Sequence, residues 1–211
     1  MKTLIVKADN SHIDQIAALL IITSYDIASA KYNTLGTDAF TYIKEYKVKP
    51  LMPFIYVAVD FNQPERVLGL LSAGPLSLIM NCSQKSYSHP ETKKIFKKFY
   101  DIHEKDIPES YYIFRFAVNK NSRNSGVGNI LFEHAQNEAK IKGFSKLTLV
   151  VWSSQIDAIR FYLRKDMEIK KIYHISDELP YPNLLYLEKD FNKKLIKNYF
   201  ESDDFFSLNL V

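Results

Sequence analysis

Residues 118–128 read VNKNSRNSGVG, and this stretch decides the fold. An apolar strand ends at Val118, a polar loop follows, and Gly126 and Gly128 open an amphipathic helix. The first turn of a helix leaves backbone N–H groups unpaired and carries a charge of about +0.5, and glycine lets a ligand approach because it has no Cβ. The stretch therefore predicts a phosphate-binding turn between a strand and a helix.

Two other phosphate-binding motifs are excluded by the same residues. A P-loop requires Gly-Lys-Ser/Thr at this point, but Gly128 is followed by Asn129 and Ile130. A dinucleotide fingerprint requires a third glycine where Leu131 stands. Two glycines by themselves also fit a simple tight turn, so the rest of the sequence has to decide between a turn and an anion site.

Hydrophobic periodicity and breaker residues predict strands and helices on both sides of this stretch. Strands are predicted at 2–7, 54–59, 66–73, 111–118, 147–152, 169–174 and 183–187. Helices are predicted after a cap at Ser11, within 37–46, and at 90–104, 126–142 and 155–164. The strand at 147–152 is almost continuously apolar, which is typical of a strand buried on both faces.

Composition narrows the class of protein. The chain has 211 residues, enough for one large domain, and 46% hydrophobic with 25% charged residues is ordinary for a soluble globular protein. The net charge of +4 falls short of the basic stripe of a nucleic-acid-binding protein, although it suits an anionic small ligand. We therefore expect no nucleic-acid partner.

Cysteine content and apolar runs restrict the chain further. Cys82 is the single cysteine, so an intramolecular disulfide and a cysteine-based zinc site are excluded, and a reducing cytoplasm fits. No apolar run reaches the ~18 residues of a membrane span, and the start of the chain does not read as a signal peptide. The expected location is cytoplasmic, with no membrane anchor and no metal.

The run from Val118 to Gly128 resembles the Val-x-Pro-x-x-Arg-Gly-x-Gly-x-Gly signature of the GCN5-related N-acetyltransferases (GNAT). Arg123, Gly126 and Gly128 match its Arg/Gln-x-x-Gly-x-Gly/Ala core. Lys120 stands where proline is usual, and Asn124 stands where the first glycine is usual. Neither departure removes the backbone donors that the turn needs.

A second match lies one strand later, at residues 155–167, which read QIDAIRFYLRKDM. This run resembles the family's Asn-x-x-Ala-x-x-Phe-Tyr-x-Lys-x-Gly-Phe pattern, with Ala158, Phe161 and Tyr162 in place. Gln155 replaces asparagine, Arg164 replaces lysine, and Asp-Met at 166–167 replaces Gly-Phe. The turn that follows this helix is therefore expected to differ from the family's turn.

The resemblance implies a mixed α/β fold (α+β). The expected acyl-CoA N-acyltransferase architecture is a central, mostly antiparallel sheet that splays between its fourth and fifth strands, with helices on both faces. We expect a single domain over residues 1–191, with a helical insertion at about 76–110 between the third and fourth strands and a C-terminal extension at 192–211.

The resemblance also implies the site residues. Tyr162 is the expected catalytic residue, because the family's tyrosine at this position protonates the departing thiolate. A backbone N–H of the strand edge 116–118 is expected to meet the oxyanion. The residues predicted to contact acetyl-CoA are Phe116, Ala117, Val118, Arg123, Asn124, Ser125, Gly126, Val127, Gly128, Asn129, Gln155, Ala158, Phe161 and Tyr162.

The proton acceptor for the amine is left open by the sequence. In the histone-acetylating branch of the family a fourth-strand glutamate serves, but Tyr112 occupies the matching position. The remaining candidates are His12, Tyr25, Asp26, Glu109 and His134. Acceptor choice is expected to depend on residues 21–46 and on the insertion.

The expected activity is transfer of an acetyl group from acetyl-CoA to a primary amine of a small molecule or peptide. The amine would attack directly within a ternary complex, and CoA would be the second product. The alternative is a catalytically silent CoA-binding or protein-interaction module of the same fold, which the missing fourth-strand carboxylate favours. The sequence leaves open whether the chain forms a homodimer.

Overall fold

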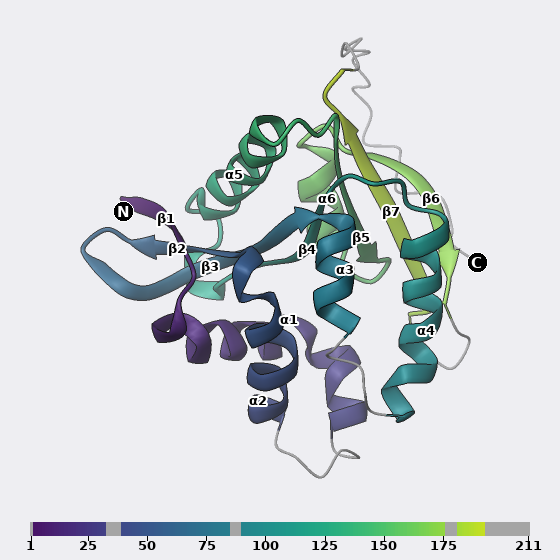
Figure 1. Cartoon of the computed structure of the whole chain (residues 1–211). Helices are drawn as coiled ribbons and strands as arrows, with labels where there is room; N and C mark the ends of the chain where they lie inside the picture. The colour runs from purple at the N-terminus through teal and green to yellow at the C-terminus, as the bar shows by residue number, and fades with distance from the viewer. Residues whose placement is uncertain (1, 33–38, 85–89, 176–180, 193–211) are drawn as a thin grey trace.

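A seven-stranded sheet organises the molecule (Figure 1). The computed structural model describes residues 2–32, 39–84, 90–175 and 181–192. The strand order is β1-β2-β3-β4-β5-β7-β6, and every pair is antiparallel except β4 with β5. The strands are β1 Thr3–Lys7, β2 Ile55–Asp60, β3 Gln63–Pro75, β4 Tyr111–Val118, β5 Lys146–Trp152, β6 Glu168–His174 and β7 Asn183–Asp190.

Helices cover both faces of this sheet (Figure 1). One face carries α1 to α4, and the other carries α5 and α6. The helices are α1 Ile13–Tyr32, α2 Ala39–Tyr42, α3 Leu76–Gln84, α4 Pro90–Lys105, α5 Val127–Ile141 and α6 Ile156–Leu163. The expected mixed α/β fold, with a mostly antiparallel sheet between two helical layers, is confirmed.

Alternation along the strands divides the core into two layers. Leu70 belongs to the cluster under α1 to α4, whereas its neighbour Leu71 belongs to the cluster under α5 and α6. Successive side chains of a strand point to opposite faces, so a strand with apolar residues at both parities supports a layer on each side. In β5, Leu149 and Val150 are divided in the same way, which confirms that this strand is buried on both faces.

The sheet opens between β4 and β5. Register pairs join Tyr111, Tyr112 and Ile113 to β5, and none joins residues 114–118 of the described β4 to that strand. The bulge lies at the same place, because Ser72 pairs with Arg115 while the next residue of β3 pairs with Ile113. A bulge adds twist and bends its strand, so β4 turns away from β5 beyond this point. The expected splay is confirmed.

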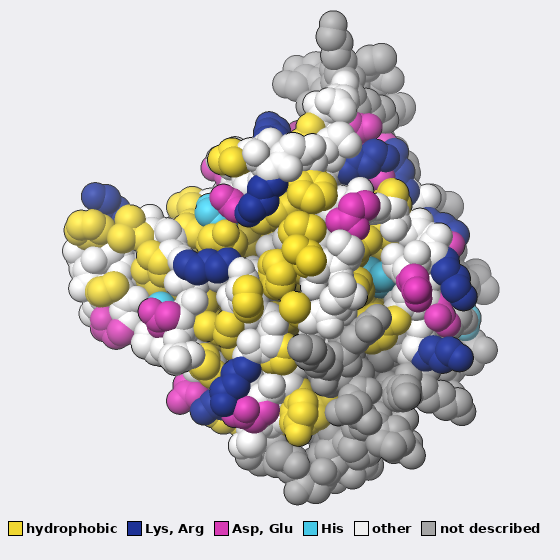
Figure 2. Space-filling view, viewed as in Figure 1, with side chains coloured by type: hydrophobic (Ala, Val, Ile, Leu, Met, Phe, Trp, Pro, Cys, Tyr) yellow, Lys and Arg dark blue, Asp and Glu magenta, His cyan; other side chains and the backbone are white. Residues whose placement is uncertain are grey.

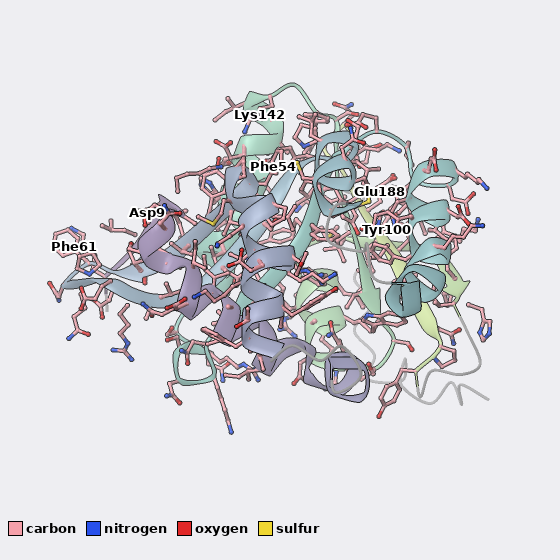
Figure 3. All side chains as sticks on the ribbon, turned by 60° about the horizontal axis from the view of Figure 1, so that its bottom comes forward. Asp9, Phe54, Phe61, Tyr100, Lys142 and Glu188 are labelled. Carbon is pink, nitrogen blue, oxygen red and sulfur yellow. The ribbon has the colours of Figure 1, made fainter. Side chains whose placement is uncertain are left out.

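The start of α1 differs from its prediction. Asp9, not Ser11, caps the first turn, a 3-10 turn η1 at Asn10–His12 (Figure 3). The Asp9 carboxylate accepts from the Ser11 N–H at 2.9 Å, and His12 Nδ1 accepts from the Asp9 N–H at 3.2 Å. The prediction of a Ser11 cap was wrong because Ser and Asp are both good caps, and the reciprocal bond from His12 selects Asp9.

Two other helical segments were incompletely predicted. The described part of the region 37–46 forms the short α2 and the start of a π-helical segment η2 at Ile43–Val48, and a 3-10 segment η3 at Lys49–Phe54 follows. Helix α3 was missed, because its sequence is short and polar at its end. Together α3 and α4 occupy the stretch between β3 and β4, where a helical insertion was expected. Residues 193–211 lie outside the described residues.

Charge and length of the described elements bear on possible partners. On the face shown in Figure 2, the described Lys and Arg side chains are interspersed with Asp and Glu, without a continuous basic stripe. No helix in the described ranges is long and apolar enough to span a membrane.

Gly69 sets how closely α5 approaches the sheet. It lies in β3 opposite Val118. A Cβ at this position would lie 2.9 Å from the Ala117 carbonyl oxygen, 3.0 Å from Leu131 Cδ1 and 3.2 Å from Val127 Cγ1. Only glycine leaves room for the first turns of α5 to rest on β3, so this residue positions the turn that precedes the helix.

We expect Gly69→Ala to lower the free energy of unfolding by about 1–3 kcal/mol, because an extra methyl group would overpack the contact between β3 and α5. Urea denaturation of both proteins measures the difference. Gly128→Ala is the matched control, since a Cβ there would lie 3.5 Å from the nearest side-chain atom, an ordinary contact. Equal losses in the two variants would contradict this role of Gly69.

Candidate functional site

The loop after β4 is held by its own hydrogen bonds. The Asn119 N–H donates to the Leu68 carbonyl at 2.8 Å, which extends the β3–β4 ladder by one residue. The Asn119 side chain accepts from the Asn121 N–H at 3.1 Å, and its carbonyl accepts from the Ser122 N–H at 2.8 Å. The Ser125 hydroxyl donates to the Ser122 carbonyl at 2.6 Å. These bonds fix the backbone before it enters α5.

Two residues of the loop adopt the left-handed conformation. Asn124 has φ of 60° and Gly126 has φ of 87°. Asparagine tolerates this region better than most residues other than glycine, because its side chain bonds locally. Asn124 therefore holds a left-handed conformation that glycine also adopts readily.

A row of backbone donors points out of this turn. Ile130 is the first residue of α5 whose N–H bonds back to the turn, at 3.1 Å from the Gly126 carbonyl. Within the described residues, the N–H groups of residues 124–129 have no acceptor, and Gly126 caps the helix without a side-chain bond. Such a nest at a positive helix end attracts an anion. The predicted order of strand, turn and helix is present, and phosphate binding by the turn stays a prediction.

Gly126 and Gly128 have different constraints. A Cβ on Gly126 would meet no atom within 4 Å, so its requirement for glycine is conformational. A Cβ on Gly128 would lie 3.5 Å from the Phe161 ring and 3.7 Å from Val118 Cγ2, which is ordinary contact. Phe161 of α6 therefore packs against the first turn of α5.

We expect Gly126→Ala to destabilise the protein by about 1–2 kcal/mol, because a Cβ strains the left-handed conformation. Gly128→Ala should leave the free energy of unfolding within about 0.5 kcal/mol, since its Cβ fits and alanine favours helix. Chemical denaturation of the pair tests this difference. A neutral Gly126→Ala would show that the turn relaxes to another conformation.

Backbone donors of β4 also face the opening in the sheet. N–H groups alternate sides along a strand, and that of Asn119 points to β3. The Ala117 N–H therefore points to β3 as well, whereas those of Phe116 and Val118 point toward β5. Register pairs with β5 end at Ile113, so these two donors lie at the edge of the splay. This is the edge where the sequence predicted an oxyanion contact.

Four aromatic rings fill the space between β4, α5 and α6. Phe116 lies 5.5 Å from Phe161 and 6.0 Å from Tyr162 between ring centroids. Phe132 of α5 lies 5.8 Å and 6.2 Å from the same two rings. The structure thus brings the predicted residues of β4 and α6 together on the face that carries the turn.

Tyr162 is buried, with 6% of its surface exposed. Burial raises the pKa of its phenol well above the usual value. No hydrogen bond of its hydroxyl is found among the described residues, and the hydroxyl is not sealed off from solvent. The phenol therefore keeps its proton at neutral pH, and that proton is available to a ligand.

The remaining predicted contacts belong to the turn, to α5 and to α6 with the residue before it. Ala158 is half-buried against the core beneath α6. Val127 is fully buried and holds α5 on the sheet, so it offers only backbone to a ligand. Arg123, Asn129 and Gln155 have exposed side chains. Gln155 precedes α6 and its carbonyl accepts from Ile159 at 3.0 Å.

Of the candidate proton acceptors, the three whose side chains the structure describes lie on separate elements. His12 belongs to the capping turn before α1, and Glu109 accepts from Ser77 at 3.3 Å and 3.4 Å. His134 packs edge-on against Tyr56, with ring centroids 4.4 Å apart. The side chains of Tyr25 and Asp26 lie outside the described residues.

Tyr112 has a partner that the sequence did not reveal. His103 of α4 places Nε2 2.6 Å from the Tyr112 hydroxyl and Nδ1 2.6 Å from the Phe99 carbonyl. A carbonyl only accepts, so Nδ1 carries the proton and Tyr112 donates to Nε2. Burial lowers the pKa of His103 to about 4. Only a helix-to-strand contact could disclose this pair, because neither residue lies in a motif.

We expect this histidine to make the protein acid-sensitive. Its pKa is lower in the folded chain than the unfolded value of about 6.5, so the unfolded state binds more protons at acid pH. The contribution of neutral His103 is complete above pH 6.5 and should fall by about 3 kcal/mol as pH drops to 4. Urea denaturation across this range measures it.

His103→Gln should remove that part of the pH dependence. His174→Gln, at an exposed position of β6, is the matched control and should retain it. Identical pH profiles for the wild type and His103→Gln would show that His103 does not titrate between the two states.

Known proteins resemble this chain in sequence and in fold. The family model described as "Acetyltransferase (GNAT) family" matches residues 85–167, which include β4, the turn, α5 and α6. The resemblance to the GNAT family is confirmed. No match was found among curated protein sequences. The family match supports an acyl-CoA acyltransferase, and the finer statements of substrate are taken up below.

Solved structures share this GNAT fold over most of the chain. An N-acetyltransferase from Staphylococcus aureus Mu50 superposes with a TM-score of 0.65 at 15% identity, covering 88% of this chain and 100% of that one. Arylalkylamine N-acetyltransferase 2 from Aedes aegypti superposes with a TM-score of 0.63 at 14% identity, covering 91% of this chain and 100% of that one. Arabidopsis thaliana Naa50, in complex with a bisubstrate analogue, superposes with a TM-score of 0.55 at 14% identity, covering 90% of this chain and 100% of that one. At these identities the likeness concerns the fold.

Proposed function

We propose that the protein transfers an acetyl group from acetyl-CoA to a primary amine of a small molecule or peptide. The observation that carries the proposal is the row of backbone donors at residues 124–129, without acceptors among the described residues and beside an opened sheet edge. The pyrophosphate of CoA fits the charge and spacing of such a row. The exposed Arg123 lies beside it and supplies a guanidinium for the same phosphates.

In this proposal the pantetheine arm enters the splay between β4 and β5. The thioester carbonyl oxygen then accepts from a backbone N–H at the strand edge, Phe116 or Val118, as negative charge develops. Such donors are already oriented, so they stabilise the oxyanion without rearrangement. The aromatic rings of Phe116, Phe132 and Phe161 occupy the adjoining space, which favours a short acyl group such as acetyl.

The chemical step is direct aminolysis. The neutral amine attacks the thioester carbonyl, a C–N bond forms, the C–S bond breaks, and the electron pair of that bond leaves with the CoA sulfur. Tyr162 donates its phenolic proton to the departing thiolate, for which its raised pKa keeps it protonated beforehand. The amine loses its proton to water, which returns a proton to Tyr162. Cys82 has no part in this scheme.

We also propose the domain organisation expected from the sequence. Residues 1–191 would act as one GNAT domain, with 76–110 as an insertion and 192–211 as an extension. Support comes from α3 and α4, which pack in the same cluster as α1 and thus complete the core instead of forming a separate one.

The alternative is a CoA-binding module without turnover. It is favoured by one observation, that Tyr112, at the position of the family's fourth-strand glutamate, is only 1% exposed and is engaged with His103. A module of this kind would bind acetyl-CoA and release no thiol with any amine.

We expect acetyl-CoA to raise the melting temperature. A concentration 100-fold above the dissociation constant adds about 2.7 kcal/mol, or about 5–10 °C for a chain of this size. The acetyl thioester of pantetheine, which lacks the pyrophosphate, is the matched control ligand and should give a much smaller shift. No shift with acetyl-CoA would contradict both the enzyme and the module.

We expect Tyr162→Phe to lower kcat by about 100-fold or more, because the thiolate would leave without a proton donor. Thiol release from acetyl-CoA measures turnover, and the melting shift shows that cofactor binding is retained. Tyr56→Phe, which removes a hydroxyl from β2 on the far side of α5, is the matched control and should leave kcat unchanged. Equal kcat in all three proteins would remove Tyr162 from the reaction.

A further inference from the structure

A cation lies on the face of β4 opposite the turn. Arg115 follows the bulge, and its guanidinium lies 4.6 Å above the ring of Phe114. Phe114 packs in the cluster beneath α1 to α4, whereas Phe116 packs in the cluster beneath α5 and α6. Successive side chains of a strand point to opposite faces, so Arg115 lies on the face opposite to Phe116. This is the side of the splay away from the turn proposed to bind CoA, and Arg115 is one residue from Phe116, whose N–H is a proposed oxyanion donor.

Arg115 has no anionic partner among the residues that the structure describes. No carboxylate there forms an ion pair with it, and its Nε is buried without an acceptor. A buried guanidinium N–H without an acceptor is unfavourable. The side chain as a whole is half-buried, so part of it is exposed to solvent.

Ser72 faces the same place. It is the cross-strand partner of Arg115, and directly opposed residues of an antiparallel pair point to the same face. Ser72 is fully buried, and its hydroxyl has no hydrogen bond in the described structure. Two adjacent strands thus present an unused donor each, a guanidinium and a hydroxyl.

Lys47 is a second basic side chain on this side of the sheet. It comes from η2, the segment after α2, and is buried. Burial, and next the positive charge of Arg115, lower the pKa of Lys47 to about 6. An anion bound beside Arg115 would favour the protonated form of Lys47, because a nearby negative charge raises the pKa of an amine.

We infer that the acceptor is an amine that also carries a carboxylate, and that Arg115, with Ser72 and Lys47, binds this carboxylate while the amine reaches the thioester through the splay. The inference rests on the proposed function. Arginine binds carboxylates through two parallel N–H bonds, and the hydroxyl of Ser72 supplies a third donor. The anion would then fix the position of the amine relative to the oxyanion contact.

Matched amines test the inference in the wild-type protein. Thiol release from acetyl-CoA is followed with phenylalanine against phenethylamine, tyrosine against tyramine and lysine against cadaverine, which differ by the carboxylate. We expect kcat/KM to be at least about 30-fold higher for a carboxylated member. Equal values within every pair would overturn the inference and leave the acetyltransferase standing. Preference for phosphoethanolamine over all carboxylated amines would also overturn it.

Variants test which residue reads the carboxylate. Arg115→Gln should lose the preference, with kcat/KM for the carboxylated amine falling about 30-fold or more and that for its decarboxylated partner changing little. Arg115→Lys should recover part of the preference, because charge is kept but the paired N–H geometry is lost. Arg66→Gln, at an exposed position of β3, is the matched control. Preference retained in Arg115→Gln would overturn the assignment.

Cofactor binding separates the two levels of failure. Arg115→Gln should retain the melting shift with acetyl-CoA, since the turn lies on the other face. If the wild type shows this shift but acetylates no amine of either set, the proposed enzyme activity fails, and the inference fails with it. If amines are acetylated without regard to the carboxylate, only the inference fails.

Discussion

The backbone of β4 loses its β5 partner after Ile113, and the arrangement of the site depends on that loss. Buried backbone donors are almost always paired. A strand that leaves its neighbour inside a domain therefore has backbone N–H groups that still need acceptors. The N–H groups of Phe116 and Val118 point to the open side, where no strand of the described residues pairs with them. On its other side, β4 stays hydrogen-bonded to β3. In the proposed function, the thioester enters this opening and accepts from these donors, so the missing strand pairing serves as a binding site.

Several features hold the opening in place. The bulge at Phe114 bends β4, and the hydroxyls of Ser110 and Thr148, 2.6 Å apart and buried, tie the paired ends of the two strands together. Gly69 lets α5 rest directly on β3, so the N-terminus of that helix lies next to the end of β4. The donors proposed for the oxyanion and for the phosphates are thereby positioned by one strand and its neighbours.

The two faces of the splay have opposite chemistry. The face under α5 and α6 offers backbone N–H groups, aromatic rings and a protonated phenol, which suit a phosphate group and a thioester. The other face offers Arg115, whose Nε is buried without an acceptor among the described residues, and that is unfavourable for a polar group. Helix α4 closes this face through the bond between His103 and Tyr112, and Tyr100 (Figure 3) donates to Ser83 at 3.1 Å. The helices between β3 and β4 therefore help to shape the proposed acceptor side.

The sequence determined what depends on neighbouring residues. Backbone preference and side-chain periodicity act over a few residues. Local spacing therefore determined the strand, turn and helix around Gly126 and the tolerance of Asn124 for the left-handed conformation. It also determined the two-sided burial of β5 and the position of Tyr162 in α6. Tertiary structure alone decided the bulge at Phe114, the bond between His103 and Tyr112, and the placing of Arg115 and Ser72 on one face. Each depends on how side chains from separate elements share a confined space, and that geometry exists only once the sheet and its helices have packed.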